Sequence, residues 1–299
     1  MKMFIKHILL FAIVIIAIDF SFGIVCRYLI QNSKGGLTEK INYTTTSLDE
    51  EVVIMGSSRA AHHYISQILA DSLRMSVYNA GFEGNGIIAA YGFLENIIEH
   101  HKPKVIIYDL SGYDVHVDDN SKYLTHLKEH YSPVVRNVFA DIDPVSPYKL
   151  YSNFYRYNSN LPRYLRDCYR PSALFNMGYQ PLYGKMKGDV EHSGTQDDLM
   201  VDSVKQYYLK CFINLLEQNN IQLAFVVSPS YKENYGKEFW EPIRLLCEKE
   251  MVPFWNFELI PGVSDDYTNF QDKVHLNDKG AIIYTDFVSK QILSMLENK

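Results

Sequence analysis

A serine lies directly after a short apolar stretch, in a position where its hydroxyl could act as a nucleophile. Val52 to Met55 are apolar and mostly β-branched, which predicts a buried strand; Gly56-Ser57-Ser58 follows, and the next residues predict a helix. A turn from strand to helix leaves a serine hydroxyl at the carboxyl edge of a sheet, close to backbone N–H groups. The pattern also fits a serine that only caps the helix.

The residues that could activate such a serine come more than two hundred positions later. Asp272 and His275 are three residues apart in Phe270-Gln-Asp-Lys-Val-His-Leu-Asn277. At this spacing the carboxylate can hold one imidazole nitrogen while the other nitrogen points outward as a general base, which a serine hydroxyl needs to become nucleophilic. The alternative is a surface turn without chemistry. An asparagine cap followed by a long apolar-periodic helix ends the chain.

The elements that must position these residues alternate between strand and helix. Strands are expected over 51–55, 76–79, 104–110, 221–227 and 252–256, and helices over 60–73, 86–101, 198–219, 237–250 and 278–297. This alternation predicts a flavodoxin-like three-layer α/β/α fold with a mostly parallel five-stranded sheet. Candidate site residues all follow predicted strands, where ligands of parallel sheets bind: Ser58, Gly84, Tyr113, Ser228 and the loop from Asp272 to His275.

Three motifs together resemble the SGNH (GDSL-type) hydrolases: Gly56-Ser57-Ser58, then Asn79-Ala-Gly-Phe-Glu-Gly-Asn85, then Asp272-x-x-His275. The resemblance spans about residues 50–298. It implies that Ser58 is the nucleophile, that Gly84 supplies an oxyanion donor, and that Asp272 and His275 complete a triad. It leaves Ser57 as the alternative nucleophile.

The chain departs from the family pattern at two positions. Ser57 stands where the family usually has aspartate, and Asp109-Leu-Ser-Gly-Tyr113-Asp114 stands where Gly-x-Asn-Asp is usual, so the oxyanion asparagine is missing and Tyr113 is nearest to its place. We expect Tyr113, Asn85 and Arg59, which adjoin the motifs, to contact substrate. Gly-Ser-Ser behind an apolar amino terminus is similar to the envelope branch that contains DltD and alginate-acetylation proteins.

Residues 1–30 are expected to form a cytoplasmic end and a transmembrane signal anchor. Ile8 to Val25 is an apolar run interrupted by Asp19 and Ser21, and lysines precede it, which predicts a cytoplasmic amino terminus and an extracytoplasmic domain. A cleaved signal peptide, cut near Ser21-Phe-Gly23, is the alternative. Asp19 is interpreted either as lying near the outer interface or as pairing with a membrane partner.

The remaining chain is expected to consist of a polar tether over 31–50 and one hydrolase-like domain over 51–299, with an insertion over 115–197. Tyrosines and arginines crowd the insertion; they predict either a thin helical core or a surface that binds sugar or phosphate. His116, His126 and His130 lack a carboxylate pattern and are expected to be exposed rather than to bind metal. The widely spaced cysteines leave one unassigned disulfide open.

Composition and motifs lead to one expected function and two alternatives. A net charge of −6 without a lysine/arginine cluster argues against nucleic acid. We expect an extracytoplasmic serine esterase or O-acyltransferase that acts on acyl esters of envelope glycans or on small esters, without cofactor or metal. The first alternative is an inactive scaffold that partners an integral membrane acyltransferase, and the second is a sugar-phosphate binder.

Overall fold

The structure is a computed structural model, and it describes residues 1–117, 124–170, 175–188, 200–232 and 235–297. The chain divides into two compact units. The N-terminal unit consists of Met1–Ser47 and Leu124–Leu174, and the α/β unit consists of Leu48–Tyr123 and Phe175–Lys299.

The α/β unit contains a five-stranded, fully parallel sheet with the strand order β2-β1-β3-β4-β5. The strands are β1 (Val52–Gly56), β2 (Val77–Asn79), β3 (Val105–Asp109), β4 (Gln222–Val227) and β5 (Phe254–Asn256). All five fall within a residue or two of the predicted strands. The predicted flavodoxin-like α/β fold is confirmed, since this strand order is the one that defines it.

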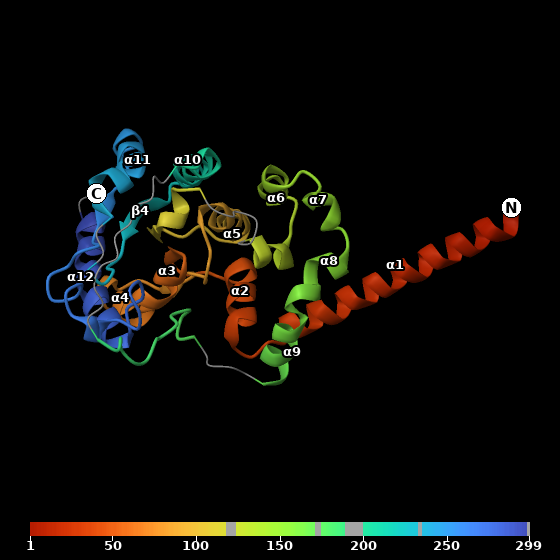
Figure 1. Ribbon diagram of the computed structural model, residues 1–299, viewed down its shortest axis with the longest axis horizontal. Helices are drawn as coiled ribbons and strands as arrows, with labels where there is room; N and C mark the ends of the chain where they lie inside the picture. The colour runs from red at the N-terminus through yellow and green to blue at the C-terminus, as the bar shows by residue number, and fades with distance from the viewer. Residues whose placement is uncertain (118–123, 171–174, 189–199, 233–234, 298–299) are drawn as a thin grey trace. The chain divides into compact units, whose positions relative to one another are not determined.

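Helices cover both faces of the sheet (Figure 1). They are α3 (Ser58–His63), α4 (Ser66–Leu73), α5 (Ile87–His100), α10 (Ser203–Gln218), α11 (Gly236–Lys249) and α12 (Asp278–Glu297), with short 3-10 turns η1 (Gly112–Asp114) and η5 (Tyr267–Asn269). The single helix predicted over 60–73 is two helices. Tyr64 and Ile65 adopt extended backbone angles between them, because the Tyr64 hydroxyl turns inward to donate to Asp109 and the Ile65 amide donates to Thr285.

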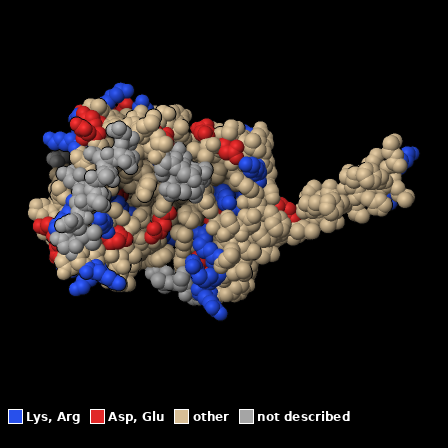
Figure 2. Space-filling view, in the orientation of Figure 1, with Lys and Arg blue, Asp and Glu red and all other residues tan. Residues whose placement is uncertain are grey.

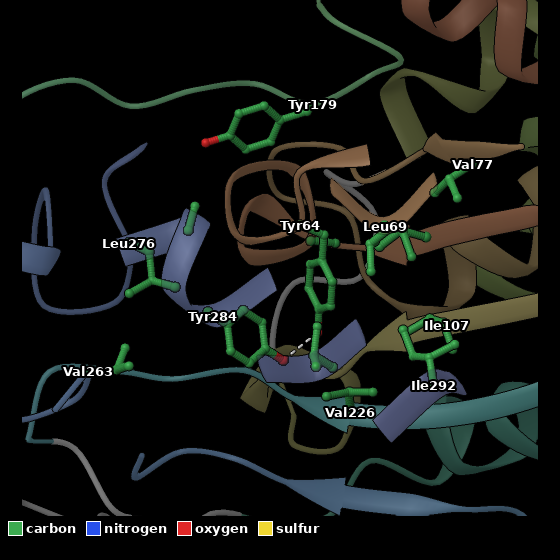
Figure 3. Packing of buried hydrophobic residues seen from close by; sticks show 14 of the residues in the cluster. Tyr64, Leu69, Val77, Ile107, Tyr179, Val226, Val263, Leu276, Tyr284 and Ile292 are labelled. Carbon is green, nitrogen blue, oxygen red and sulfur yellow. Dashed lines mark hydrogen bonds between the residues drawn. The ribbon is translucent and has the colours of Figure 1, made fainter. Parts of the chain in front are cut away.

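The core of this unit follows from the alternation of side chains along the buried strands. Ile54, Ile107 and Val226 face α3, α4 and α12, and they form one cluster with Leu69 and Ile292. Figure 3 shows Tyr64 and Tyr284 meeting in the middle of this layer, with their hydroxyls 3.0 Å apart. On the opposite face, Tyr108 and Phe225 pack against Phe212 of α10.

The N-terminal unit is entirely helical among its described residues. It contains α1 (Lys2–Gln31), α2 (Gly36–Thr46), η3 (Leu127–His130), α6 (Arg136–Ile142), α7 (Ser146–Lys149), α8 (Asn153–Tyr157), η4 (Asn158–Asn160) and α9 (Leu161–Tyr169). The polar tether predicted over 31–50 is largely the helix α2 instead. Thr38 is buried and donates through both its amide and its hydroxyl to Asp167, and these contacts supply the hydrogen bonds that an extended tether would have found in water.

Helix α1 is long and apolar enough to cross a membrane, as far as length and composition decide. Most of its side chains before Phe22 are exposed apolar groups. In Figure 2 its shaft carries almost no charged side chains, and basic groups lie at its free end.

Several expectations for the insertion over 115–197 are wrong in their details. Residues 175–188 belong to the α/β unit, where the Asn79 amide donates to the Met177 carbonyl (2.9 Å) and the Met186 amide to the Phe270 carbonyl (2.9 Å). The histidines are not exposed: His116 is buried, and burial lowers the pKa of His126 and of His130 to about 4. The four cysteines are unpaired.

Candidate active site

A glycine with a positive φ places the serine motif at the carboxyl end of β1. Gly56 has φ of +136°, and a Cβ atom there would lie 2.5 Å from the carbonyl oxygen of Asp109 on the neighbouring strand β3. Only glycine fits this close approach and this backbone conformation. Ser57 follows as the buried N-cap residue, and Ser58 then opens α3 with its side chain half-buried.

Ser58, His275 and Asp272 form one continuous hydrogen-bonded row. The Ser58 hydroxyl lies 2.7 Å from His275 Nε2. On the other side of the ring, His275 Nδ1 lies 2.9 Å from Asp272 Oδ2 and 3.0 Å from Oδ1. These separations are those of a nucleophile, its general base and the carboxylate that orients the base.

The Asp272 carboxylate is held as an anion by its own turn. Burial alone would raise its pKa, but hydrogen bonds from the His275 ring and from the backbone amides of Val274 and His275 outweigh that effect, so the pKa lies below its usual value. The turn is fixed at both ends: the Gln271 amide donates to the His275 carbonyl (2.9 Å), and Phe270 and Leu276 form an antiparallel bridge.

The predicted asparagine cap of the last helix is confirmed. The Gly280 amide donates to Asn277 Oδ1 (3.0 Å), so Asn277 caps the start of α12 directly after the triad turn.

The second motif forms a tight loop against α3. The Asn79 side-chain amide donates to the carbonyls of Ala60 (2.7 Å) and Tyr64 (2.9 Å), and its oxygen accepts the Gly81 amide (3.0 Å). A Cβ atom at Gly81 would lie 2.5 Å from the amide nitrogen of Ala61. The loop therefore needs a glycine there to pack against the helix that begins at the serine.

Two backbone amides are available as oxyanion donors in this arrangement. Gly84 has φ of +67°, which suits glycine, and the Ser58 amide opens α3. Among the residues that the structure describes, neither the Ser58 amide nor the Gly84 amide donates a hydrogen bond. The oxyanion role that the resemblance implied for Gly84 stays a prediction, since no bound group marks the position.

Tyr113 lies on the short turn η1 after β3 and is 58% exposed. Asp114 holds this turn by accepting the Ser111 amide (2.7 Å) and the Tyr108 hydroxyl (2.8 Å). Burial is the largest influence on Asp114 and raises its pKa to about 6, although those hydrogen bonds act in the opposite direction. A Cβ atom at Gly86 would lie 3.6 Å from the Tyr113 carbonyl, so this turn adjoins the loop that carries Gly84.

Two residues that were expected to contact substrate, Arg59 and Asn85, are buried. Arg59 is 7% exposed; its Nε donates to the Ser228 hydroxyl (3.1 Å), its Nη2 donates to the Ser228 carbonyl, and Nε lies 3.7 Å from Asp109 Oδ1. It can be this deep because Asp109 compensates its charge. Asn85 is also buried. The structure therefore gives Arg59 an internal ion pair, and the substrate contacts expected of Arg59 and Asn85 stay predictions.

His62 and His63, which follow the serine on the same helix, were not among the predicted site residues. His62 Nε2 lies 2.7 Å from Glu83 Oε1, and its ring meets that of His275 edge to face with centroids 5.5 Å apart. The spacing from Ser58 to His62 is i to i+4, which places both on one face of a helix. That spacing could have indicated His62 as a site residue from the sequence alone.

His63 connects the serine helix to the histidine turn. Its Nε2 accepts the Leu276 amide (2.9 Å), and its Nδ1 lies 2.8 Å from the Ser228 hydroxyl. Full burial, together with the positive charges of Arg59 and neighbouring histidines, lowers the pKa of His63 well below its usual value. The ring is therefore neutral. Its Nδ1–H donates to the Ser228 hydroxyl, and the lone pair of Nε2 accepts the Leu276 amide.

Within the described residues no group of three or more histidine, cysteine or acidic side chains lies close enough to hold a metal ion. What the described site offers is a serine, an oriented imidazole and free backbone amides. These groups suffice for acyl transfer through a covalent intermediate.

Comparisons with known proteins match at the level of structure only. No family model and no curated protein sequence matches the chain. Similar solved structures include the psychrotrophic esterase EstA from Pseudoalteromonas (12% identity, TM-score 0.45, covering 82% of this chain and 98% of that one). They also include a GDSL-like lipase from Bacteroides thetaiotaomicron (12% identity, TM-score 0.38, covering 92% of this chain and 99% of that one). A third is an acetyl-xylooligosaccharide esterase variant from Geobacillus (11% identity, TM-score 0.42, covering 81% of this chain and 94% of that one).

Identities this low transfer no residue roles, so the roles of the site residues depend on the geometry above. The strand order, the turn that presents Ser58 and the aspartate–histidine turn before the last helix agree with the motifs found in the sequence. The resemblance to the SGNH (GDSL-type) hydrolases therefore rests on these motifs and their geometry.

Proposed function

We propose that the protein is a membrane-anchored, extracytoplasmic serine esterase or O-acyltransferase that acts on acyl esters. The observation that carries the proposal is the unbroken row from the Ser58 hydroxyl through both nitrogens of His275 to Asp272, at 2.7 Å and 2.9 Å. A serine that only caps a helix does not need an oriented imidazole within hydrogen-bond distance of its hydroxyl.

The chemistry follows from the row. His275 Nε2 takes the hydroxyl proton while Ser58 Oγ attacks the ester carbonyl carbon, and the carbonyl π-electrons move to oxygen. The tetrahedral intermediate collapses with loss of the alcohol, which receives the proton from His275. Asp272 stays ionised and stabilises the imidazolium. Water or an acceptor hydroxyl then attacks the acyl-serine by the same route and releases the acid or a new ester.

The oxyanion that forms needs donors, and the backbone amides of Ser58 and Gly84 are the candidates. The Ser58 amide opens α3, and Gly84 lies in a turn that the Asn85 amide closes by donating to the Phe82 carbonyl (3.1 Å), so both amides can be aimed before the reaction starts. With Tyr113 in place of the family's asparagine, the proposed hole depends on backbone donors.

The membrane anchor is helix α1. Its exposed apolar shaft and the lysines at positions 2 and 6 support a spanning helix with a cytoplasmic amino terminus, so that the chain after α1 lies outside the cytoplasm. Such a tether would keep the site near the bilayer, which favours esters of envelope glycans over freely diffusing substrates.

Turnover of p-nitrophenyl acetate by the full-length protein in detergent micelles tests the activity. We expect release of p-nitrophenol by the wild type and by Ser57→Ala, and none above background with Ser58→Ala or His275→Ala. Adding a soluble oligosaccharide separates the two reactions, since a transferase forms acetylated sugar that mass spectrometry detects. Equal turnover by Ser58→Ala and wild type would overturn the proposal.

One observation favours a second function, an inactive scaffold that partners an integral membrane acyltransferase. The exposed Tyr113 is the residue nearest to the place of the oxyanion asparagine in the SGNH pattern, and that asparagine is missing from this sequence. A folded wild-type protein that neither turns over esters nor reacts at Ser58, yet is pulled down with such an acyltransferase, would support the scaffold.

A further inference from the structure

The part of α1 nearest the folded N-terminal unit carries an acidic residue with a complete set of donors. Both carboxylate oxygens of Asp19 accept hydrogen bonds from the start of α8: the Ser152 hydroxyl (2.7 Å), the Asn153 amide and side-chain nitrogen (each 2.9 Å) and the Phe154 amide (2.9 Å). Asp19 therefore acts as a cap supplied by another helix, and it fixes α8 against α1 at this level.

Further contacts hold α8 along the next two turns of α1. The rings of Phe22 and Phe154 stack with centroids 4.2 Å apart, and Arg27 donates to Asn153 Oδ1 (3.1 Å). A Cβ atom at Gly23 would lie 2.2 Å from the same Asn153 oxygen. The position of α8 beside α1 is thus set by close packing and by charge.

The segment from α7 to α8 also exposes aromatic rings. We call this surface the aromatic collar and define it as Tyr148, Tyr151, Phe154 and Tyr155; Tyr151 is 73% exposed. Basic side chains adjoin it, with Arg136 5.9 Å from the Tyr148 ring centroid and Lys128 5.3 Å from that of Tyr155. Aromatic rings flanked by lysine and arginine are typical of the membrane–water interface.

The length of α1 indicates where that interface lies. The segment from Lys2 to Ile18 spans only about 25 Å at 1.5 Å per residue, less than the hydrocarbon thickness of about 30 Å. The apolar surface continues beyond Asp19 on the side that α8 leaves open, through Phe20, Ile24 and Tyr28. A bilayer that covers this surface must reach the level of α8.

The charge of the N-terminal unit agrees with this placement. Residues 8–47 and 124–174, which leave out the lysines at the proposed cytoplasmic end, contain ten lysines and arginines against six aspartates and glutamates, a net charge of +4 within a chain of −6. The α/β unit carries −12. The unit with the collar is the one that anionic lipid headgroups would attract.

We propose that the aromatic collar is a membrane-interface element that inserts among the lipid headgroups of the leaflet from which α1 emerges. It holds the N-terminal unit against the bilayer surface, and the Asp19 cap fixes its depth. This inference rests on the proposed anchoring by α1 and not on the proposed esterase activity.

Tryptophan fluorescence in proteoliposomes tests the depth of the collar. Full-length Tyr151→Trp is reconstituted in mixed phosphatidylcholine and phosphatidylglycerol, with the phosphatidylcholine brominated either near the carbonyl end or near the methyl end of its acyl chains. Both natural tryptophans, Trp240 and Trp255, lie in the α/β unit, and the parent protein supplies their background.

Two further variants serve as controls in the same unit. Phe11→Trp reports the middle of the anchor. Tyr169→Trp lies at the end of α9, where the Lys34 amide donates to the Asp167 carbonyl (2.9 Å). That level is about 18 Å or more beyond Asp19 along the axis of α1, so an exposed tyrosine of the same unit is compared at a different depth.

We expect the added fluorescence of Tyr151→Trp to be quenched most by bromine near the carbonyl end, that of Phe11→Trp most by bromine near the methyl end, and that of Tyr169→Trp by neither. Quenching of Phe11→Trp without quenching of Tyr151→Trp would overturn the collar and leave the anchor. No quenching of either would overturn the anchor and, with it, the collar. An emission shift of Tyr151→Trp caused only by a soluble oligosaccharide would overturn it in favour of a sugar-stacking surface.

Discussion

The backbone amide of Leu276 donates a hydrogen bond to Nε2 of His63 over 2.9 Å, and this bond joins the helix that begins at Ser58 to the turn that carries His275. The two catalytic candidates are 217 positions apart in the chain. His63 is buried and also contacts Ser228 after β4, so segments that follow β1, β4 and β5 meet at one neutral ring. This connection supports the alignment of Ser58 with His275.

The first prediction concerns this connection. Replacing His63 by alanine leaves the buried Leu276 amide without an acceptor, which costs about 1–3 kcal/mol, and loosens the turn. We expect His63→Ala to lower kcat for p-nitrophenyl acetate by a larger factor than the factor by which it changes KM. Glutamine can offer an oxygen near the Nε2 position, so His63→Gln should retain most of the turnover. Equal losses in both variants would argue that His63 only fills space.

The second prediction is a pH dependence of stability that His63 causes. Its pKa is lowered in the folded protein, whereas in the unfolded chain it returns to about 6.5. As pH falls below 6.5 the unfolded chain binds a proton that the folded protein does not, so the free energy of unfolding falls by up to about 1.4 kcal/mol per pH unit.

Urea unfolding followed by tryptophan fluorescence measures this effect on the α/β unit, because both tryptophans lie there. The free energy of unfolding of the wild type, relative to that of His63→Gln, should fall as pH is lowered from 7 to below 6. A difference that stays constant with pH would show that His63 is not the titrating group.

The third prediction distinguishes an internal ion pair from a substrate contact at Arg59. Arg59→Met leaves Asp109 buried without its counter-charge, and breaking such a pair typically costs about 3–5 kcal/mol. We expect a loss of this order in urea unfolding, partly restored in Arg59→Met/Asp109→Asn, where Tyr64 can still donate to the side-chain oxygen. Unchanged stability combined with a raised KM would instead make Arg59 a substrate ligand.

The fourth prediction concerns the missing asparagine. If backbone amides form the oxyanion hole, the Tyr113 hydroxyl is dispensable, and Tyr113→Phe should change kcat far less than the roughly hundredfold that loss of one donor costs. Tyr113→Asn should raise kcat, because the new amide can add a donor. A hundredfold loss in Tyr113→Phe would assign the donor to the phenol.

The strands and the triad could be predicted from sequence because local signals determine them. β1 to β5 are short runs of apolar residues with turn residues after them, and the aspartate–histidine spacing lies within one turn of chain. Parallel sheets place such turns at a common edge, so residues far apart in sequence could be grouped without a structure.

The errors arose where long-range contacts override local composition. Arg59 reads as a polar helix residue, and its burial depends on Asp109 and Ser228, which are 50 and more positions away. The polar residues of α2 resemble a linker, but Asp167 supplies their partner. The helix break at Tyr64 likewise depends on Asp109 and Tyr284. No pattern within a short window contains these partners.

The most direct measurement is covalent labelling of the full-length protein with a fluorophosphonate probe, with the modified residue located by mass spectrometry. Ser57→Ala is the matched control, because it removes a neighbouring hydroxyl that makes no contact with His275. We predict a single adduct on Ser58 in the wild type and in Ser57→Ala, and none in Ser58→Ala or His275→Ala. The prediction would be contradicted if the wild type stays unlabelled although its tryptophan fluorescence shows that it is folded. An adduct that persists in Ser58→Ala would equally contradict an activated serine at this position.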